Sequence, residues 1–230
     1  MLDQLSPDFD EGTRDLWRFV QPFTMTSPER IFALRQSVQY IVRHGIAGDI
    51  VECGIWKGGS MMAIARTLQE CGVIDRNLLL FDTFDGMTPP TREDVDINGA
   101  AAAGLLSESA KQTSSIWAYA ALEEVRDNLR ITGYPEDRMF FIKGKVEDTI
   151  PERAPDQIAL LRLDTDWYES TSHELLHLYP RVSQGGVIII DDYGHWAGAR
   201  KAVDHYMAKH NLKILLHRID YTGRIFMKPS

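Results

Sequence analysis

The sequence lacks a long hydrophobic run: no stretch approaches the roughly 20 consecutive apolar residues that a membrane-spanning helix needs. The first residues, MLDQLSPDFDEGTRDLW, are acidic and have neither the basic start nor the apolar centre of a secretory signal. These two absences exclude a membrane partner and predict a cytoplasmic protein.

Basic residues are also scarce, with 25 Lys and Arg against 33 Asp and Glu, and the formal net charge is −8. No basic cluster stands out, and a protein that neutralises phosphate backbones needs one. The sequence therefore excludes nucleic acid as a partner. A solvated acidic surface explains most of the excess, although a metal site built from carboxylates leaves the same excess.

Cysteine is rare, because Cys53 and Cys71 are the two in the chain. Their spacing matches no zinc or redox motif, and two thiols make no disulfide framework. Hydrophobic residues are plentiful, at 44% of 230 residues, which is enough for a sizeable core. We therefore predict a single domain over residues 1–230.

Apolar strands and amphipathic helices alternate along most of the chain. Short, nearly continuous apolar runs predict strands at 49–54, 78–82, 139–144, 158–164 and 186–191, with two more at 213–217 and 224–227. Helical spacing predicts helices at 27–45, 60–70, 117–129, 170–178 and 197–210. The alternation predicts an α/β fold with a mostly parallel, doubly wound sheet, an antiparallel C-terminal edge and an N-terminal helical segment over 1–45.

Residues 85–115 interrupt this alternation. They contain GMTPPT at 86–91, an acidic patch and GAAAAG at 99–104, with little periodic structure. Such a segment inside a compact domain is usually functional or disordered. Because it follows the end of a predicted strand, where ligands bind in open α/β sheets, we predict a lid over the substrate in preference to a passive insertion.

A glycine-rich turn, ECGIWKGGS at 52–60, joins the first predicted strand to a helix. It matches neither the GxGxxG pattern of dinucleotide sites nor the GxxxxGK[ST] of the phosphate-binding loop, which disfavours a nicotinamide oxidoreductase. Asp82 ends the second predicted strand, where an acid accepts hydrogen bonds from ribose hydroxyls. Together, Gly54 and Asp82 predict an adenosine site without a pyrophosphate. That site suits S-adenosylmethionine, with Glu52 facing the aminoacyl end directly or through water, unless Glu52 and Asp82 merely cap loops.

Gly144, Val146 and Asp148 follow the third predicted strand and are weaker candidates for the same site. In a fold of this type, the loop after the third strand borders the adenine. Asp148 is equally well explained as an acid in the first turn of a helix, where the helix dipole favours a negative charge.

Acidic residues follow the fourth and fifth predicted strands, in DTDWY at 164–168 and DDYGH at 191–195. If these strands are neighbours, Asp164, Asp191 and Asp192 converge, and three close carboxylates need either protonation or a cation. Oxygen ligands with open water positions suit Mg²⁺. The alternative is that the acids only cap the helices that follow.

A divalent ion with exchangeable positions lowers the pKa of a bound hydroxyl and orients it for methyl transfer. Asp166 lies two residues beyond the first predicted ligand, and we predict that it is the general base. His195 is the alternative base, although a histidine just after a strand is more often a positioning or structural group.

Four stretches together resemble the macrocin O-methyltransferase family: MTS at 25–27, VECGIWKGGSMM at 51–62, LFDTFDGM at 80–87 and LDTDWYEST at 163–171. The resemblance runs from about residue 25 to the C-terminus. It implies a Rossmann-like class I methyltransferase fold and a homo-oligomer. It also implies methylation of sugar hydroxyls on macrolide and aminocoumarin antibiotics, with S-adenosylmethionine and Mg²⁺.

The resemblance assigns roles residue by residue. It implies metal ligands at Asp164, Asp191 and Asp192, and a base at Asp166. It also implies cofactor contacts near the glycine turn and the second strand, at Met25, Thr26, Glu52, Ser60 and Asp82. Residues 85–115, where substrate choice is expected to lie, match no one member of the family.

We therefore predict a magnesium-dependent O-methyltransferase that uses S-adenosylmethionine and acts on a hydroxyl of a small, glycosylated or polyhydroxylated natural product. Two alternatives stay open. A phosphatase or phosphotransferase is suggested by Asp164-Thr165-Asp166, which imitates a DxD nucleophile motif, although Tyr168 stands where Thr or Val normally follows. The second alternative is a module that binds the cofactor without turnover.

Overall fold

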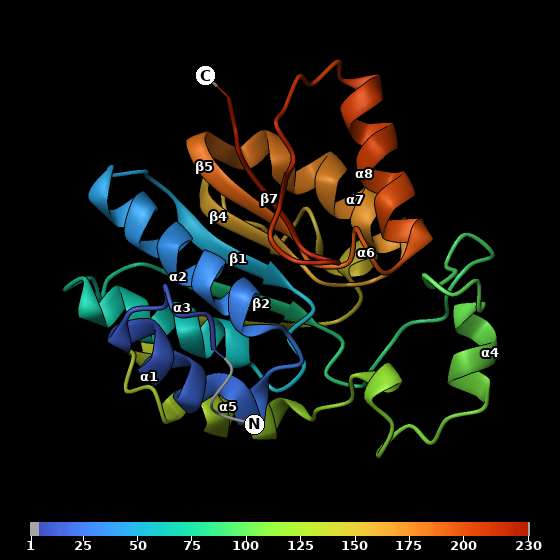
Figure 1. Ribbon diagram of the computed structural model, residues 1–230, viewed down its shortest axis with the longest axis horizontal. Helices are drawn as coiled ribbons and strands as arrows, with labels where there is room; N and C mark the ends of the chain where they lie inside the picture. The colour runs from blue at the N-terminus through green and yellow to red at the C-terminus, as the bar shows by residue number, and fades with distance from the viewer. Residues whose placement is uncertain (1–4, 230) are drawn as a thin grey trace.

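The computed structural model describes residues 5–229, and within them seven strands form one sheet in the order β3-β2-β1-β4-β5-β7-β6 (Figure 1). The strands are β1 (Asp49–Cys53), β2 (Leu78–Asp82), β3 (Met139–Lys143), β4 (Ile158–Leu163), β5 (Val182–Ile190), β6 (His217–Arg218) and β7 (Arg224–Met227). Strands β1 to β5 pair in parallel, and β7 lies antiparallel between β5 and β6. This confirms the predicted mostly parallel sheet with an antiparallel C-terminal edge.

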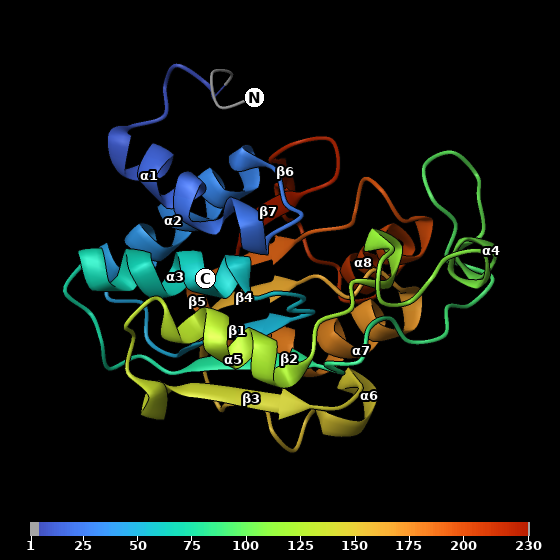
Figure 2. The same cartoon turned by 90° about the horizontal axis from the view of Figure 1, so that it is seen from below.

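Helices cover both faces of the sheet (Figure 2). One layer consists of α1 (Glu11–Val20), α2 (Pro28–Arg43), α3 (Gly59–Glu70) and α5 (Leu122–Arg130), and the other of α6 (Val146–Thr149), α7 (Tyr168–Leu178) and α8 (Ala197–Lys209). Short 3₁₀ helices lie at Gln21–Phe23, Ser115–Trp117, Glu136–Arg138 and Tyr179–Arg181. Successive strand side chains point to opposite faces, so Ile50 of β1 packs in the first layer and Val51 in the second. This double burial explains why the strands read as continuous apolar runs.

Helix α2 begins where its sequence predicts. The Ser27 hydroxyl accepts a hydrogen bond from the backbone N–H of Arg30 at 3.2 Å, and Pro28 occupies the first turn. Buried residues such as Ile31 and Leu34 hold the helix against the sheet. The cap therefore fixes Arg30 in the first turn of α2, beside the end of β5, where it forms an ion pair with Asp191.

Three predicted elements have clearly wrong boundaries. Strand β5 begins at Val182, four residues before the start predicted at 186. The helix predicted over 117–129 begins only at Leu122, because a 3₁₀ helix ends at Trp117 and Ala118 has a φ of 42°, which an α-helix cannot continue. The strand predicted over 213–217 is reduced to His217–Arg218. Leu215 is 85% exposed, and residues 213–216 pair with no neighbouring strand within 5–229, so most of this apolar run lies outside the sheet.

Residues 85–115 extend away from the sheet and carry a short helix, α4 (Ala102–Ser107) (Figures 1 and 2). The segment is anchored at its near end: the Trp167 indole N–H donates to the Thr88 carbonyl at 2.9 Å. The backbone N–H of Tyr168 donates to the fully buried Asp94 carboxylate at 2.7 Å. The segment therefore has more regular structure than predicted, and its first half is tied to the start of α7.

The carboxyl ends of β1, β2, β4 and β5 lie at one edge of the sheet, since these strands run parallel. The turn after β1 and the acidic residues after β4 and β5 all leave the sheet at this edge. Within residues 5–229, no helix is both long enough and apolar enough to cross a membrane.

Candidate active site

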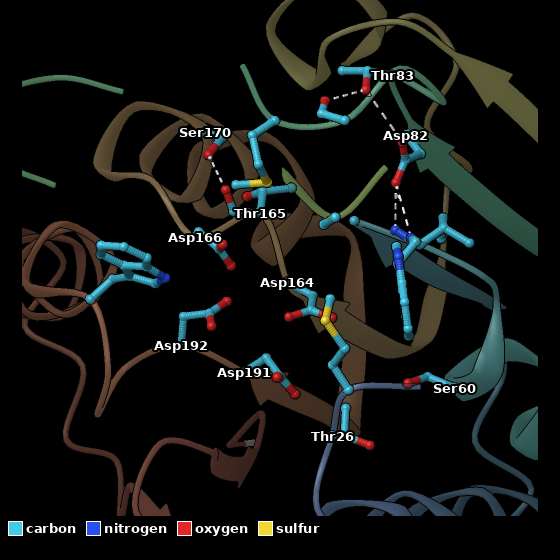
Figure 3. A pocket seen from close by; sticks show the side chains of 18 of the residues that line it. Thr26, Ser60, Asp82, Thr83, Asp164, Thr165, Asp166, Ser170, Asp191 and Asp192 are labelled. Carbon is cyan, nitrogen blue, oxygen red and sulfur yellow. Dashed lines mark hydrogen bonds between the residues drawn. The ribbon is translucent and has the colours of Figure 1, made fainter. Parts of the chain in front are cut away.

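A cavity of about 450 Å³ lies at this carboxyl edge (Figure 3). Its wall comes from the segment before α2, the turn after β1, the end of β2 and the loops after β3, β4 and β5. Most of the residues predicted from the sequence line it: Met25, Thr26, Gly54, Ser60, Asp82, Gly144, Val146, Asp164, Asp166, Asp191, Asp192 and His195. The fold thus brings together residues that lie as far apart in the sequence as Met25 and His195.

Two predicted cofactor residues do not lie on the cavity wall. Glu52 is 1% exposed, and its carboxylate forms an ion pair with the Arg162 guanidinium on the neighbouring strand β4. Asp148 is exposed, on the first turn of the four-residue helix α6. Its position fits the alternative of an acid placed by the helix dipole.

Asp82 holds the glycine turn in shape. One carboxylate oxygen accepts the backbone N–H of Ile55 at 2.6 Å and of Trp56 at 3.4 Å, and the other accepts the N–H of Phe84 at 2.6 Å (Figure 3). Burial raises the pKa of Asp82, and these N–H donors oppose the rise. The structure therefore combines both interpretations of Asp82, because it caps the turn and also lines the cavity.

Gly54 permits a close approach of strands β1 and β4. It has a φ of +83°, and a Cβ atom there would lie 1.9 Å from the Asp164 carbonyl oxygen. No larger residue fits in this position, so the glycine brings the turn after β1 directly against the turn after β4.

Three carboxylates form a group that we call the carboxylate trio: Asp164, Asp166 and Asp192 each offer an oxygen, and these atoms lie within 4.8 Å of one another. One oxygen of Asp192 is buried and has no hydrogen-bond partner among the described residues. The sequence predicted that Asp164, Asp191 and Asp192 would converge. The structure brings these three to the same cavity, but it groups Asp166, and not Asp191, with the other two.

Asp191 instead belongs to an arginine network, which consists of Arg30, Arg162, Glu52 and Asp191. Arg162 donates to Asp191 at 2.5 Å and to Asp164 at 2.7 Å, and it also pairs with Glu52. Arg30 pairs with the second oxygen of Asp191. Adjacent residues at the end of a strand point in opposite directions. The Asp191 carboxylate therefore contacts the two arginines, while the Asp192 carboxylate lies beside those of Asp164 and Asp166.

Burial and charge set the ionisation of these acids. Burial raises the pKa of Asp166 to about 7, with repulsion from Asp164 and Asp191 adding to the rise and a hydrogen bond with Asp192 opposing it. Burial likewise raises the pKa of Asp164 and Asp192 well above the ordinary range. Burial acts on Asp191 too, but Arg162 and Arg30 hold its pKa below the ordinary value. One acid of the four is thus stabilised as an anion, while the trio favours a proton or a cation.

The sequence analysis missed Arg162 and Arg30. Arg162 is 3% exposed in β4, a strand whose other residues are all apolar and buried. A charged residue in a strand covered on both faces needs an opposite charge, and this signal was present in the sequence. Its partner follows from the register, because Glu52 of β1 pairs directly with Arg162 of β4.

His195 lies at the outer end of the cavity, next to residues 85–115. Its ring nitrogen Nδ1 is 3.4 Å from the Tyr221 hydroxyl, and its ring stands edge-on to the buried Trp196. Met87 and Ile116 line the same part of the cavity. This end therefore offers apolar and aromatic surface with a few polar groups.

A mostly parallel sheet of this order, with β7 inserted antiparallel and a cavity at the carboxyl edge, is the architecture of the class I O-methyltransferases. The match to known proteins is more specific. The model of the macrocin O-methyltransferase family (TylF) matches residues 6–228, and the chain belongs to this family.

Two relatives and one solved structure illustrate the similarity. Demethyldecarbamoylnovobiocin O-methyltransferase of Streptomyces niveus is 36% identical over 200 residues, which are 87% of this chain and 73% of that protein. The 8-demethyl-8-(2,3-dimethoxy-alpha-L-rhamnosyl)-tetracenomycin-C 4'-O-methyltransferase of Streptomyces olivaceus is 34% identical over the same shares. The structure of the O-methyltransferase NovP superposes with a TM-score of 0.78 at 33% identity, covering 90% of this chain and 83% of that chain. The protein is therefore an O-methyltransferase, as predicted, and the phosphatase alternative is dropped.

Proposed function

We propose that this enzyme transfers the methyl group of S-adenosylmethionine to a sugar hydroxyl of a small natural product, with Mg²⁺ bound beside the acceptor. The observation that carries the proposal is the carboxylate trio, which lines the same cavity as the glycine turn and Asp82 (Figure 3). Methyl transfer is an in-line displacement, so the protein must position two substrates and remove one proton.

The residues at the turn fit the methyl donor. Asp82 fixes the turn, and Ser60 stands in the first turn of α3, whose N–H groups have no partners within the helix. A helix N-terminus favours a negative charge, and the donor carries a carboxylate on its aminoacyl group. Met25 and Thr26 line the same cavity. We propose that these residues bind the donor, with Gly144 and Val146 near its base.

The acids fit a magnesium ion. The trio supplies hard oxygen ligands, and the buried, unpartnered oxygen of Asp192 is an atom that a cation would satisfy. We propose Asp164, Asp191 and Asp192 as ligands and Asp166 as the base. When bound, the ion would supply a positive charge that favours the deprotonated form of a coordinated hydroxyl. The alternative ligand set is Asp164, Asp166 and Asp192, because these are the three carboxylates that lie together in the structure.

Asp166 is suited to accept the proton of the acceptor hydroxyl. Its pKa of about 7 leaves a substantial deprotonated fraction at neutral pH, and it lines the cavity. His195 remains the alternative base. Because it contacts Tyr221 and Trp196, we propose that it positions the acceptor.

The acceptor end of the cavity suits a ring with hydroxyl groups. Trp196 and Tyr221 offer aromatic surface there. Met87, within residues 85–115, and Ile116, directly after them, add apolar surface. The Streptomyces olivaceus relative is named for a rhamnosyl-bearing substrate, which supports a sugar acceptor. We propose that residues 85–115 cover the acceptor as a lid. A chain shortened within 99–104 should then bind substrate more weakly with little change for the cofactor, and equal losses would indicate a structural insertion.

Calorimetry with S-adenosylhomocysteine, with and without Mg²⁺, tests the proposal. We expect micromolar-scale binding that survives removal of the metal, while methyl transfer to a panel of deoxysugar-bearing compounds requires it. A mass gain of one methyl group identifies the acceptor. Binding without turnover on any acceptor would favour the non-catalytic module, and no binding at all would refute the donor site.

We also keep three predictions that concern the whole molecule. The family resemblance implies a homo-oligomer, which light scattering of the purified protein tests. The sequence predicts a cytoplasmic location, which cell fractionation tests. It predicts a single domain, for which one cooperative unfolding transition is the expected result.

A further inference from the structure

The turn that carries Asp166 has an unusual backbone. The N–H of Trp167 donates to the carbonyl of Thr165 at 2.7 Å, which closes a three-residue turn around Asp166. Asp166 itself has a φ of +68°, in the left-handed region that disfavours residues other than glycine. A three-residue turn with a positive φ at its centre is rare and strained. It persists only where its surroundings hold it.

A buried acid on helix α7 supplies such a hold. The Thr165 hydroxyl donates to Glu174 Oε1 at 2.9 Å, and Glu174 has no exposed surface. The Ser170 hydroxyl lies 3.4 Å from the Thr165 carbonyl and 3.2 Å from the Trp167 carbonyl (Figure 3). Residues of α7 thus hold the turn both through the Thr165 side chain and through its backbone carbonyls.

Glu174 is difficult to explain as a packing residue. Its second oxygen is buried and has no hydrogen-bond partner among the described residues, and burial raises the pKa of Glu174 well above its ordinary value. A buried polar group with one of its atoms unsatisfied destabilises a protein, whereas an apolar side chain at the same place does not. The Thr165 hydroxyl, between the two aspartates of the turn, donates to Glu174, and the buried Cys53 thiol is a second, weaker donor beside it.

We propose that Glu174 is a positioning residue: through the Thr165 hydroxyl it holds the strained turn and thereby aims the Asp166 carboxylate at Asp164 and Asp192. The inference rests on the proposed function in one respect, the role of Asp166 as the base. Glu174 touches neither substrate nor cofactor in this scheme. Its effect reaches the reaction only through the conformation of residues 164–167.

Two pairs of variants test the hydrogen bond and not the packing. Thr165→Val removes the donor at nearly constant shape, and Thr165→Ser restores it. Glu174→Leu removes the acceptor, and Glu174→Gln retains an acceptor oxygen. We expect Thr165→Val and Glu174→Leu to lower kcat on the order of 10- to 100-fold, because a small misplacement of a reacting group has effects of this size. The KM for the acceptor and the affinity for S-adenosylhomocysteine should stay within about twofold of wild type, since the cavity wall is otherwise intact.

The conservative variants and the double variant sharpen the test. Thr165→Ser and Glu174→Gln should recover most of the lost kcat. Thr165→Val combined with Glu174→Leu should be no slower than the worse single variant, because both changes break one interaction. If Thr165→Ser is as slow as Thr165→Val, packing and not the hydroxyl is responsible and the inference is wrong. Thr165→Val alone decides the matter if Glu174→Leu does not fold.

A crystal structure of Thr165→Val beside that of the wild type separates this inference from the proposed function. We expect Asp166 to relax to a negative φ in the variant and to move away from Asp192. If φ stays positive and the trio is unchanged, the inference fails even when the wild type methylates its acceptor. If the wild type shows no methyl transfer but Asp166 relaxes as expected, the positioning role stands and the proposed function fails.

Discussion

The two charged groups at the carboxyl edge, the arginine network and the carboxylate trio, are neighbours with opposite properties. In the network, Asp191 and Glu52 meet the guanidinium of Arg162 and are almost fully buried. In the trio, Asp166 and Asp192 meet other carboxylates and line the cavity. Asp164 joins the two, because it pairs with Arg162 and also belongs to the trio.

This difference shows that one sheet edge holds acids in two electrostatic environments. A buried charge with an opposite partner is compensated and stays where it is, whereas like charges held together remain high in free energy until a proton or a cation arrives. The ion pairs of the network therefore form a fixed structure next to the reactive trio. The variants below change one group at a time and are ordered by the expected size of the effect.

Arg162→Met should have the largest effect, on stability. It leaves Glu52 and Asp191 buried and short of a partner, which should lower the free energy of unfolding by about 3–5 kcal/mol. Urea denaturation measures the loss. Arg18→Met is the matched control, because Arg18 forms ion pairs with side chains that are more than half exposed, and its loss should leave the free energy of unfolding nearly unchanged. Equal losses for the two variants would contradict the distinction between network and surface.

Asp192→Asn and Asp191→Asn separate the two proposed ligand sets. Asp192 belongs to both sets, so its variant should lose metal-dependent turnover by roughly 10³-fold, corresponding to several kcal/mol of charge stabilisation. Asp191→Asn should also lose metal-dependent turnover while binding S-adenosylhomocysteine nearly as well as the wild type. Titration with Mn²⁺ measures the metal affinity of both. An Asp191→Asn protein that binds Mn²⁺ normally would instead select Asp164, Asp166 and Asp192.

Asp166→Asn should lower the rate of methyl transfer by about 100-fold or more, the usual scale for a general base. Single-turnover kinetics at saturating donor isolates this step. Asp148→Asn is the control, because Asp148 is exposed and lies outside the cavity wall, and its rate should change by less than about twofold. Full activity of Asp166→Asn across the pH range would transfer the role of base to His195.

The pH dependence of stability should show the raised pKa of Asp166 in the metal-free protein. Because the pKa is about 7 when folded and 3.8 ordinarily, the folded state binds the proton more tightly. The stabilisation from this proton is fully present below pH 3.8 and is lost as the pH rises through about 7. Between these values the free energy of unfolding should fall by up to about 1.4 kcal/mol per pH unit for one proton. Denaturant titrations of the wild type minus those of Asp166→Asn isolate this slope, and identical slopes would refute the assignment.

Much of the sheet was predictable because its central strands β1, β2 and β4 are buried on both faces. The run at 78–82 coincides with β2. The alternation of strands and helices predicted that the sheet is mostly parallel. Asp82, Asp164, Asp191 and Asp192 were found because each follows such a run, and strand ends converge in a parallel sheet. The strand predicted at 213–217 failed because edge strands need a neighbour, and an apolar run alone does not show whether one is present.

The details of the site depended on contacts that sequence patterns do not carry. Adjacent acids at 191 and 192 look alike in the sequence, but they face an arginine network and a carboxylate trio respectively. Glu52 was expected to face the cofactor, and it pairs with Arg162 because the register of β1 and β4 sets the two side by side. Glu174, in the middle of a helix, gave no sign that it would hold Thr165.

By itself, the sequence determined the α/β architecture, the edge of the sheet that bears the site and the acids that gather there. Local patterns of apolar residues indicate which strands are buried, and the alternation with helices indicates that the strands run in parallel. The tertiary structure decided which acid meets an arginine, which acids meet one another and how the turn at Asp166 is held. These outcomes depend on register and on side-chain direction between segments far apart in the chain, and no local pattern encodes either.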